Sequence, residues 1–423
     1  MCSLFRTLRA KHFKHMNTQT PLARRQFLQR SSAATAAAVA APWLSRAAGA
    51  NERINIGIIG TGGRNGALMG EILNLAAKHN VQVTAVCDVW KKNLHAAAER
   101  VQQKAGETPR EFTRFQELLA LKEVDAVVIA TPDFAHGPML VAALKAGKDV
   151  YIEKPMSIEL APANEALDLA RTHKRVVQAG TQYRSDGKHR AAAKLLATGV
   201  LGQISRISVE MNFNQARWIR DFADCKEADV DWDAFLMGLP QRPFDARLLR
   251  QWQLFRFTSN GISGLWMSHY SDIVHLIMNA KYPADVVAHG GTYVWKDGRE
   301  HTDTFHALLN YPEGFLFSWG MALGNSAGTH FSVHGTKGTM DMHKWIYSSE
   351  GGTGDKIPET KLEPEPGPTH MENWLQCLRT RQRPNADIQF GHQHAVATMM
   401  AAAALETGRR QKWDAAKREI VAG

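Results

Sequence analysis

A glycine-rich loop that follows an apolar run most constrains the fold of this chain. The apolar run is Arg53–Ile59, the loop spans residues 60–66 (GTGGRNG), and an amphipathic stretch continues to Lys78. Strand, glycine loop and helix in this order form the context of a dinucleotide-binding fingerprint. Gly60 would make the tight turn and Gly62 would let the backbone approach a pyrophosphate, whose charge the helix N-terminus would favour. The chain is therefore predicted to be an α/β protein that begins with a Rossmann domain.

The acidic residue that such a fingerprint requires follows the next strand. Val81–Cys87 has the composition of a buried strand, and it ends at Asp88, 22 residues after the last glycine of the loop. A carboxylate at this position accepts the ribose hydroxyls of NAD. Lys91 and Lys92 follow closely, so NADP is not excluded. The third glycine of the pattern is displaced, and Asn65 stands at its position. The loop residues expected to contact the cofactor are Gly60, Gly62, Gly63, Arg64 and Asn65.

Two further strand ends carry polar side chains. The apolar run Val124–Ala130 ends in the segment 131–136 (TPDFAH), and Val150–Ile152 ends in Glu153-Lys154-Pro155. A lysine at the carboxyl end of a strand in an open α/β sheet lies at the crevice where ligands bind. Pro155 fixes the backbone there and allows the preceding peptide bond to be cis. The alternative for Lys154 is a surface lysine beside a turn.

These four motifs at these spacings resemble the glucose-fructose oxidoreductase, inositol dehydrogenase and rhizopine-catabolism family (Gfo/Idh/MocA), from about Arg53 to the C-terminus. The resemblance implies a Rossmann domain, residues 51–175, followed by an α/β domain, residues 176–423, with a large, mostly antiparallel open sheet. One face of that sheet usually serves in oligomerisation, so a homodimer or homotetramer is expected. Within the family Lys154 would hydrogen-bond the reacting hydroxyl and the nicotinamide ribose. The other residues expected to line the cofactor are Thr131, Pro132, His136 and Glu153.

Catalysis is expected in the segment 264–276 (GLWMSHYSDIVHL). Oxidation of a secondary alcohol requires a base, and the imidazole of His269 suits that task near neutral pH. If the segment is helical, Asp272 lies three residues away on the same face and could orient the ring. The family pattern has an acid at the position of Leu265. An apolar residue cannot hold a substrate hydroxyl there, so either another polar group substitutes or the chemistry differs from ordinary dehydrogenation.

Candidate substrate contacts lie in the second domain. The segment Gly180–Arg184 resembles the family segment that enters the substrate pocket, although a solvated loop is the alternative. Aromatic residues suited to stacking on sugar rings occur farther along the chain. The substrate contacts predicted from these observations are Gln182, Tyr183, Arg184, Trp218 and Tyr293. No metal site is predicted, because His269, Asp272 and His275 leave the outer two about 120° out of register on a helix.

The formal net charge of +10 would by itself suggest that the protein binds nucleic acid, but the position of the charged residues argues against this. Residues 1–50 contain eight Lys or Arg and no Asp or Glu, so a nucleic-acid partner is not predicted. The segment Ala23–Gln29 (ARRQFLQ) resembles a twin-arginine export signal, and an apolar stretch, Ser31–Leu44, and a small-residue cleavage site follow it. Residues 1–50 are therefore predicted to be a signal peptide that uses the twin-arginine export machinery, with Met1 or Met16 as the start. The expected destination is the periplasm or another exported location.

That destination narrows the expected function. A periplasm supplies no free nicotinamide pool, so an exported NAD enzyme must keep its cofactor and restore it in every cycle. The first hypothesis is an oxidoreductase that acts on a secondary hydroxyl of a sugar or sugar derivative, with a tightly bound, recycled cofactor. The first alternative is an NAD-dependent glycoside hydrolase or lyase that works through a transient keto-sugar. The second alternative is a non-catalytic sugar-binding protein in which Lys154 and His269 are idle.

Overall fold

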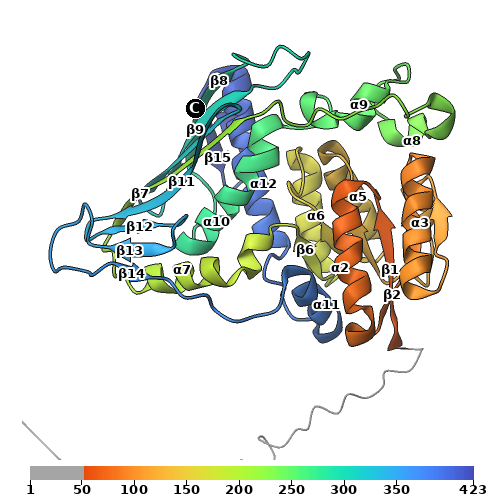
Figure 1. Ribbon diagram of the computed structural model, residues 1–423, viewed down its shortest axis with the longest axis horizontal. Coiled ribbons are helices and arrows are strands. Elements are labelled where there is room, and N and C mark those ends of the chain that lie inside the picture. Colours follow the sequence, from red (N-terminus) through yellow and green to blue (C-terminus); the bar gives the residue numbers. More distant parts are fainter. Residues whose placement is uncertain (1–51) are drawn as a thin grey trace, which may run out of the picture. The chain divides into compact units, whose positions relative to one another are not determined.

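Buried β-branched runs in the first half of the chain build a six-stranded parallel sheet (Figure 1). The computed structural model describes residues 52–423, and the expected signal peptide, residues 1–50, lies outside them. The sheet order is β3-β2-β1-β4-β5-β6. Its strands are β1 (Ile54–Ile59), β2 (Val81–Cys87), β3 (Arg110–Phe112), β4 (Ala126–Ile129), β5 (Asp149–Ile152) and β6 (Val177–Ala179). The helices between them are α2 (Gly63–His79), α3 (Lys91–Ala105), α4 (Phe115–Leu119), α5 (Asp133–Lys145) and α6 (Leu160–Thr172).

Alternating side chains of this sheet feed two separate cores. Ile56 and Ile58 of β1 pack with α2 and α3, whereas Ile59 packs with α4, α5 and α6. Because successive side chains of a strand point to opposite faces, one sheet buries apolar residues on both sides. This is the predicted doubly covered parallel sheet. Its sixth strand, β6, ends at Ala179, so the first layer runs a few residues past the boundary that we expected at residue 175.

The second half of the chain forms a ten-stranded open sheet. Its order is β14-β13-β12-β11-β7-β10-β9-β8-β15-β16, and every adjacent pair is antiparallel except β7 with β10, which is parallel. The mostly antiparallel second sheet is therefore confirmed. Its longer strands are β7 (Ile204–Asn214), β8 (Asp285–Gly291), β9 (Thr304–Tyr311), β10 (Phe315–Ala322) and β11 (Gly324–Gly335). Its shorter strands are β12 (Thr339–Asp341), β13 (Ile346–Ser348), β14 (Thr360–Lys361), β15 (Gln411–Asp414) and β16 (Glu419–Ala422).

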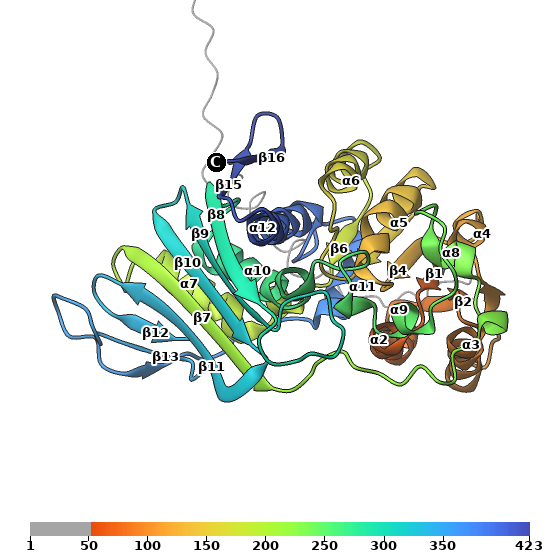
Figure 2. The same ribbon diagram turned by 90° about the horizontal axis from the view of Figure 1, so that it is seen from above.

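Three helices cover one face of this second sheet: α7 (Gly187–Ala197), α10 (Ser268–Met278) and α12 (Ile388–Thr407). In both ribbon views α10 and α12 lie between the two sheets (Figures 1 and 2). Helix α12 contributes Ile388, Ala395 and Met399 to the core of the parallel sheet. On its other side Val396 and Met400 join the core of the antiparallel sheet. The two domains therefore share one helix.

Two segments of the second half return to the Rossmann domain. Helix α11 (His370–Thr380) packs Trp374 and its neighbours against α2 and β1. Residues 215–262, which we call the crossing segment, run over the carboxyl ends of β1 and β2 and contain η3 (Glu227–Asp229), α8 (Trp232–Leu236), α9 (Ala246–Arg250) and η4 (Trp252–Leu254). None of the helices within residues 52–423 combines the length and apolar character that crossing a membrane requires.

Candidate active site

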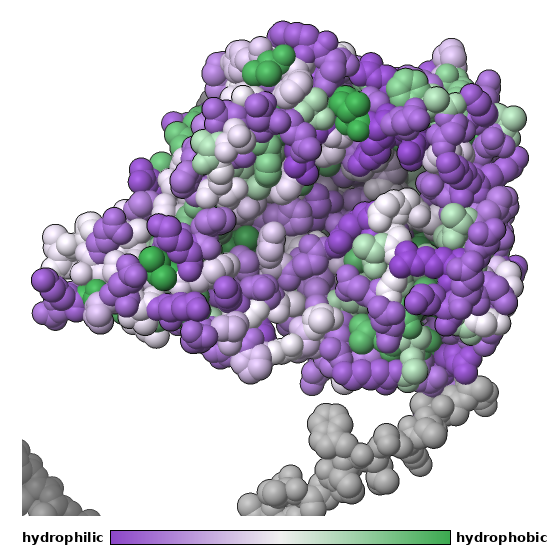
Figure 3. All heavy atoms as spheres, in the orientation of Figure 1, coloured by the Kyte–Doolittle hydropathy of each residue, from purple (hydrophilic) through white to green (hydrophobic). Residues whose placement is uncertain are grey.

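A cleft of about 560 Å³ opens at the carboxyl ends of the parallel strands. Its other walls come from the crossing segment and from the start of α10, and Figure 3 shows the molecular surface hollowed between the two halves. The sequence-predicted residues that line it are Gly60, Gly62, Gly63, Arg64, Asp88, Thr131, Pro132, His136, Glu153, Lys154, Gln182, Trp218 and His269. Five predicted site residues are not among the residues that line it: Asn65, Tyr183, Arg184, Asp272 and Tyr293. The chain thus brings its glycine loop and its predicted catalytic lysine and histidine into one space.

The glycine loop has the backbone that a dinucleotide requires. Gly60 has a φ of 77°, and a Cβ there would lie 2.7 Å from Thr131 Cγ2. Gly62 precedes α2 and leaves open space, since the nearest atom to a Cβ there would be Asn93 Nδ2 at 3.8 Å. The N-terminus of α2 therefore faces room for a diphosphate, whose charge its amide groups and dipole would stabilise. The residues present fit NAD.

Asn65 does not contact this space, contrary to expectation. Its side chain is fully buried, and Nδ2 donates to the carbonyl oxygens of Ile59, at 3.1 Å, and Gly60, at 2.7 Å. At the position of the displaced glycine, the Asn65 side chain therefore hydrogen-bonds the main chain at the start of the loop. Its role is to hold the turn.

Asp88 both supports the loop and faces the cleft. Its Oδ2 accepts from the amide of Thr61 at 2.7 Å and from the Thr61 hydroxyl at 3.1 Å, and its Oδ1 accepts from the amide of Trp90 at 2.9 Å. Burial raises the pKa of Asp88, and these hydrogen bonds oppose that rise. The Asn93 side chain, which also lines the cleft, is a fourth hydrogen-bonding partner of Asp88. A carboxylate offers about four acceptor positions, so a ribose hydroxyl would compete with Asn93 for this carboxylate.

Glu153 fixes the side chains at the end of β5. Arg64 Nε donates to its Oε1 at 2.6 Å, and Gln182 Nε2 donates to the same oxygen at 3.1 Å. Burial lowers the pKa of Arg64, but Glu153, Tyr151 and Glu71 together outweigh this effect, so the pKa is raised overall. Arg64 and Gln182 are thereby held at the mouth of the loop from the first and second domains.

His136 joins two strand ends. Its Nδ1 lies 2.8 Å from the Pro155 carbonyl oxygen, and its Nε2 lies 2.9 Å from the Thr131 carbonyl oxygen. Burial lowers the pKa of this histidine. With both ring nitrogens against carbonyl groups, His136 positions the residues that flank it. The Lys154–Pro155 peptide bond is cis, as the sequence allowed.

Lys154 reaches across to the second domain. Its Nζ donates to the main-chain carbonyl of Leu265 at 2.9 Å. Leu265 lies in η5 (Ser263–Met267), a π-helical turn that precedes α10. Such turns change the hydrogen-bonding partners along a helix and are frequent at functional sites. The family pattern has an acid where this chain has Leu265. The main-chain carbonyl of Leu265 therefore supplies the hydrogen-bond acceptor that its side chain cannot.

Asp133 is a buried carboxyl group that the sequence argument did not single out. It begins α5, is 1% exposed, and its Oδ2 accepts from the Ser259 hydroxyl at 3.1 Å. The same oxygen lies 3.5 Å from the position that a Cβ on Gly264 would take, next to Leu265. Burial raises the pKa of Asp133 to about 7, and the charge of Lys154 opposes that rise. The signal for it was present: Asp133 follows Thr131-Pro132 at a strand end, where Lys154 also lies.

The ring of His269 contains one buried nitrogen, Nδ1, without a hydrogen-bonding partner among the described residues. Its ring lies against Tyr183, with centroids 5.7 Å apart, and near Trp266, at 6.4 Å. Burial, and secondarily the charge of Lys154, lower the pKa of His269 well below 6.5. The imidazole is therefore uncharged at neutral pH, and His269 lines the cleft in which a proton donor would bind.

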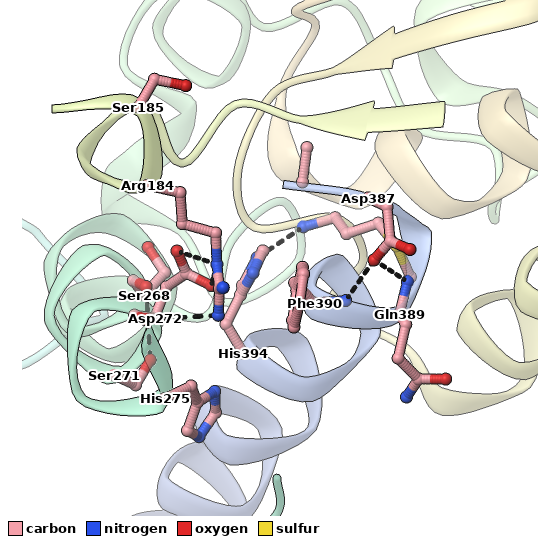
Figure 4. Close-up of polar contacts among 12 residues, drawn as sticks. Arg184, Ser185, Ser268, Ser271, Asp272, His275, Asp387, Gln389, Phe390 and His394 are labelled. Atoms are coloured by element: carbon pink, nitrogen blue, oxygen red, sulfur yellow. Dashed lines mark hydrogen bonds and ion pairs between the residues drawn. The ribbon is translucent and has the colours of Figure 1, made fainter. Parts of the chain in front are cut away.

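Asp272 does not orient His269, which corrects our expectation. Arg184 Nε donates to both carboxylate oxygens of Asp272, at 2.8 and 2.9 Å, and the two side chains are 3% and 0% exposed (Figure 4). Arg184 comes from η2 (Gln182–Ser185), and its guanidinium lies 3.7 Å from the ring centre of Phe390 in α12. The pair joins η2, α10 and α12. Arg184 is therefore a structural residue and is not free to contact a substrate.

Two predicted aromatic contacts also fall outside the cleft. Tyr293 is 62% exposed, on the loop after β8. Tyr183 is 40% exposed and touches the site through the edge of His269. Trp218 does line the cleft, as predicted. The cleft residues that sequence reasoning missed include Asn93, Asp133, Arg217, Arg220, Trp252, Gln253 and Trp266.

Comparisons with known proteins agree with this arrangement. The model of the oxidoreductase family's NAD-binding Rossmann fold matches residues 54–181, and that of the family's C-terminal alpha/beta domain matches residues 193–412. The chain is 31% identical to an inositol 2-dehydrogenase of Rubrobacter xylanophilus over 155 residues, which are 36% of this chain and 42% of the relative. It is 38% identical to a glycosyl hydrolase family 109 protein of Solibacter usitatus over 112 residues, 25% of each chain.

The match therefore spans less than half the length of either curated relative. Among solved structures, the aldose-aldose oxidoreductase of Caulobacter crescentus aligns with a TM-score of 0.63 at 20% identity, over 85% of this chain and 99% of that one. At this identity the alignment shows a common fold. The two matched domains together show that the chain belongs to the Gfo/Idh/MocA oxidoreductase family and carries that family's NAD-binding Rossmann domain.

Proposed function

We propose that this protein transfers a hydride between bound NAD and a secondary hydroxyl of a sugar or sugar derivative. The observation that carries the proposal is the meeting of three groups in one cleft: the glycine loop, Lys154 and His269. An alcohol loses its proton more readily as hydride leaves the same carbon, so a base and a hydrogen-bond donor are needed at one oxygen. The chain supplies both at the substrate side of the cleft.

The glycine loop and the N-terminus of α2 would hold NAD, which would supply the hydride acceptor. Lys154 donates a hydrogen bond to the reacting oxygen, and His269 takes the hydroxyl proton at a ring nitrogen. The low pKa of His269 keeps its acceptor nitrogen free of a proton at neutral pH. Burial lowers the pKa of Lys154, and the neighbouring Asp133 carboxyl counteracts that effect. Ionised Asp133 would thus keep the lysine charged as a donor.

We further propose that the protein is exported through a twin-arginine signal to the periplasm and keeps its cofactor through a closed redox cycle. The crossing segment supports retention, because it bonds to the strand end that carries Asp88: the amide of Asp231 donates to the Val89 carbonyl at 2.8 Å. Phe235 of the same segment packs on Phe134 of α5, with centroids 5.6 Å apart. A second substrate would return the hydride. The outer face of the antiparallel sheet, where Leu308 and Val287 are exposed, is the proposed homo-oligomer interface.

An alternative is cleavage of a glycoside through a transient ketone, which the 38% identity to a glycosyl hydrolase family 109 protein favours. In that reaction oxidation of a ring hydroxyl to a ketone acidifies the neighbouring C–H, and loss of that proton eliminates the glycosidic group. Water then adds to the unsaturated ketone, and hydride returns to the ketone carbon. Asp133 is the buried carboxyl group at hand for the C–H proton. Both reactions begin with the same hydride transfer.

The first experiment is to denature the purified mature protein and assay the supernatant for nicotinamide. A stoichiometric amount of NAD is expected, and the loaded protein is then screened with pairs of sugars and with glycosides. Absence of NAD together with weak binding of added NAD would contradict the closed cycle. Unchanged sugar turnover in Lys154→Met would contradict the assignment of the reaction to this site.

A further inference from the structure

One wall of the cleft carries arginine side chains that have no acidic partner. Arg217 and Arg220, both in the crossing segment, line the cleft opposite the glycine loop. Within residues 52–423 neither forms an ion pair with an Asp or Glu within 4.0 Å. Arg220 donates instead to neutral acceptors, the Gln253 side chain at 2.7 Å and the Arg250 carbonyl at 3.1 Å. The wall therefore has an excess of positive charge.

The guanidinium of Arg217 lies against two neighbouring aromatic rings, whose centres are 5.5 Å apart. Its guanidinium lies 4.8 Å from the ring centre of Phe213 and 4.9 Å from that of Trp266. Its Nη1 donates to the Gln215 side chain at 3.3 Å. Stacking in this way stabilises a cation while leaving the edge of the guanidinium, with its N–H groups, free for a planar anion. Burial lowers the pKa of Arg217, with no carboxylate to oppose it.

The backbone around Arg217 is fixed. The amide of Gln215 donates to the Leu323 carbonyl at 3.0 Å, and Trp295 Nε1 donates to the same oxygen at 2.7 Å. Arg299, paired with Asp297 at 2.7 Å, reaches the Arg217 carbonyl. The side chain is thus presented by the end of the antiparallel sheet. These contacts fix the main chain that carries Arg217, and the side chain itself is half-buried.

Its place in the cleft is on the side where a substrate would react. Trp266, which carries the guanidinium, lies one residue after Leu265, the acceptor of Lys154, and its ring is 6.4 Å from that of His269. The diphosphate of the cofactor has a separate place, at the N-terminus of α2 beside Arg64. Arg217 is therefore available to the second ligand.

We propose that the substrate is an anionic sugar, whose carboxylate, phosphate ester or sulfate ester pairs with Arg217 while a secondary hydroxyl faces Lys154 and His269. The proposal rests on the proposed function, since it names the substrate class of the same site. Arg217 fixes the end of the sugar that does not react. In this way it selects the hydroxyl that is presented for oxidation.

The test uses the NAD-loaded full chain and matched pairs of neutral and charged sugars. In the gluco, galacto and N-acetylglucosamine series, the neutral sugar is compared with its uronate, its 6-phosphate and its 6-sulfate. Calorimetry measures binding, and nicotinamide absorbance measures turnover. The variants are Arg217→Gln, Arg217→Lys, and Arg110→Gln as a control, since Arg110 also stacks on a phenylalanine but lies away from the cleft. Inorganic sulfate controls for binding of any anion.

We expect a charged member of one series to bind more tightly than its neutral counterpart, and Arg217→Gln to weaken that binding about ten- to a hundredfold. Arg217→Lys should recover part of the loss, because it restores the charge without the planar fork, and Arg110→Gln should bind as the parent protein does. The uronate, phosphate and sulfate arms identify the anion.

Equal binding of charged and neutral sugars, absence of binding of every charged sugar, or an unchanged preference in Arg217→Gln overturns the proposal. If neutral sugars are oxidised at a rate that Arg217→Gln does not change, the anion site is overturned and the proposed reaction still stands. Binding of a charged sugar that depends on Arg217, without hydride transfer to NAD, overturns the reaction and leaves the anion site standing. The two failures are therefore distinguishable.

Discussion

Two buried pairs of a cation and an acid flank the start of α10, and they differ in how completely they are closed. Nε of Arg184 donates a bifurcated hydrogen bond to both carboxylate oxygens of Asp272, at 2.8 and 2.9 Å, and solvent does not reach either side chain. Lys154 and Asp133 influence each other's pKa but form no ion pair within 4.0 Å, and both line the cleft. The first pair is buried and lies outside the cleft, so a ligand in the cleft does not contact it. In the second pair both side chains can still hydrogen-bond a ligand and exchange protons, as a reactive site requires.

The largest effect should come from opening the closed pair. Asp272→Ala leaves the guanidinium of Arg184 buried without its carboxylate, and such losses typically cost about 3–5 kcal/mol. Denaturant unfolding, monitored by tryptophan fluorescence, measures the free energy of unfolding. Replacing both partners with Arg184→Met and Asp272→Leu should recover much of the loss, because no charge is then left uncompensated. If Asp272→Ala keeps its stability and loses only turnover, Asp272 has a catalytic role and not a structural one.

The second pair, Lys154 and Asp133, should show a large effect on turnover and little effect on stability. Lys154→Met removes the donor to the reacting oxygen and should lower kcat about 10²–10⁴-fold. Its free energy of unfolding should be unchanged or higher, because a partly buried charge is removed. NAD content, measured after denaturation, serves as the control that the cofactor domain is intact. Loss of stability comparable to that of Asp272→Ala would show that the two pairs are alike.

The titration of Asp133 gives a smaller and pH-dependent effect. The folded-state pKa is raised from 3.8 to about 7, so the folded protein binds an extra proton between these values. Stability should therefore fall as pH rises from about 4 to about 7 and level off above it. Asp133→Asn should flatten this part of the stability profile, which thermal unfolding across pH can measure.

The same variant separates Asp133 from His269 in the pH dependence of kcat. If ionised Asp133 keeps Lys154 charged, kcat should rise with pH through about 7, and Asp133→Asn should abolish that rise. The pKa of His269 lies too low to produce it. A rise near pH 7 that persists in Asp133→Asn would assign the titration to another group.

The smallest effect is expected from an ion pair that solvent reaches. Arg418 and Asp168 are bidentate, at 2.7 and 2.8 Å, but their side chains are well exposed. Arg418→Gln should change the free energy of unfolding by no more than about 1 kcal/mol, and less at high salt. Urea unfolding with and without added salt measures this. A cost near that of Asp272→Ala would mean that burial is not what separates the pairs.

The sequence was sufficient for the fold because local patterns determine it. The buried runs of β1, β2, β4 and β5 are short and continuous, as parallel strands covered on both faces must be. The glycine loop and Asp88 then identify the strand–turn–helix unit and the strand that follows it. The same logic placed Lys154 at the cleft, since the carboxyl ends of parallel strands share one edge.

Long-range partners were beyond that logic. A spacing of three residues places His269 and Asp272 on one side of a helix, but it does not reveal that Arg184, 88 positions earlier, reaches the same carboxylate. For the same reason the sequence did not identify Asn65 as a buried support of the loop. Arg217 lies in a segment without periodicity, and only the packing of Phe213 and Trp266 against it reveals its position.

Helix α12, which packs into both cores, has a consequence for how ligands enter. Domain closure around a hinge would need the two sheets to rotate against each other, and a 20-residue helix anchored in both opposes that rotation. The width of the cleft is then set during folding, before any ligand arrives. Admission and release would depend on movements of the crossing segment, so the rate of product release would be governed by a covering loop and not by the opening of two domains.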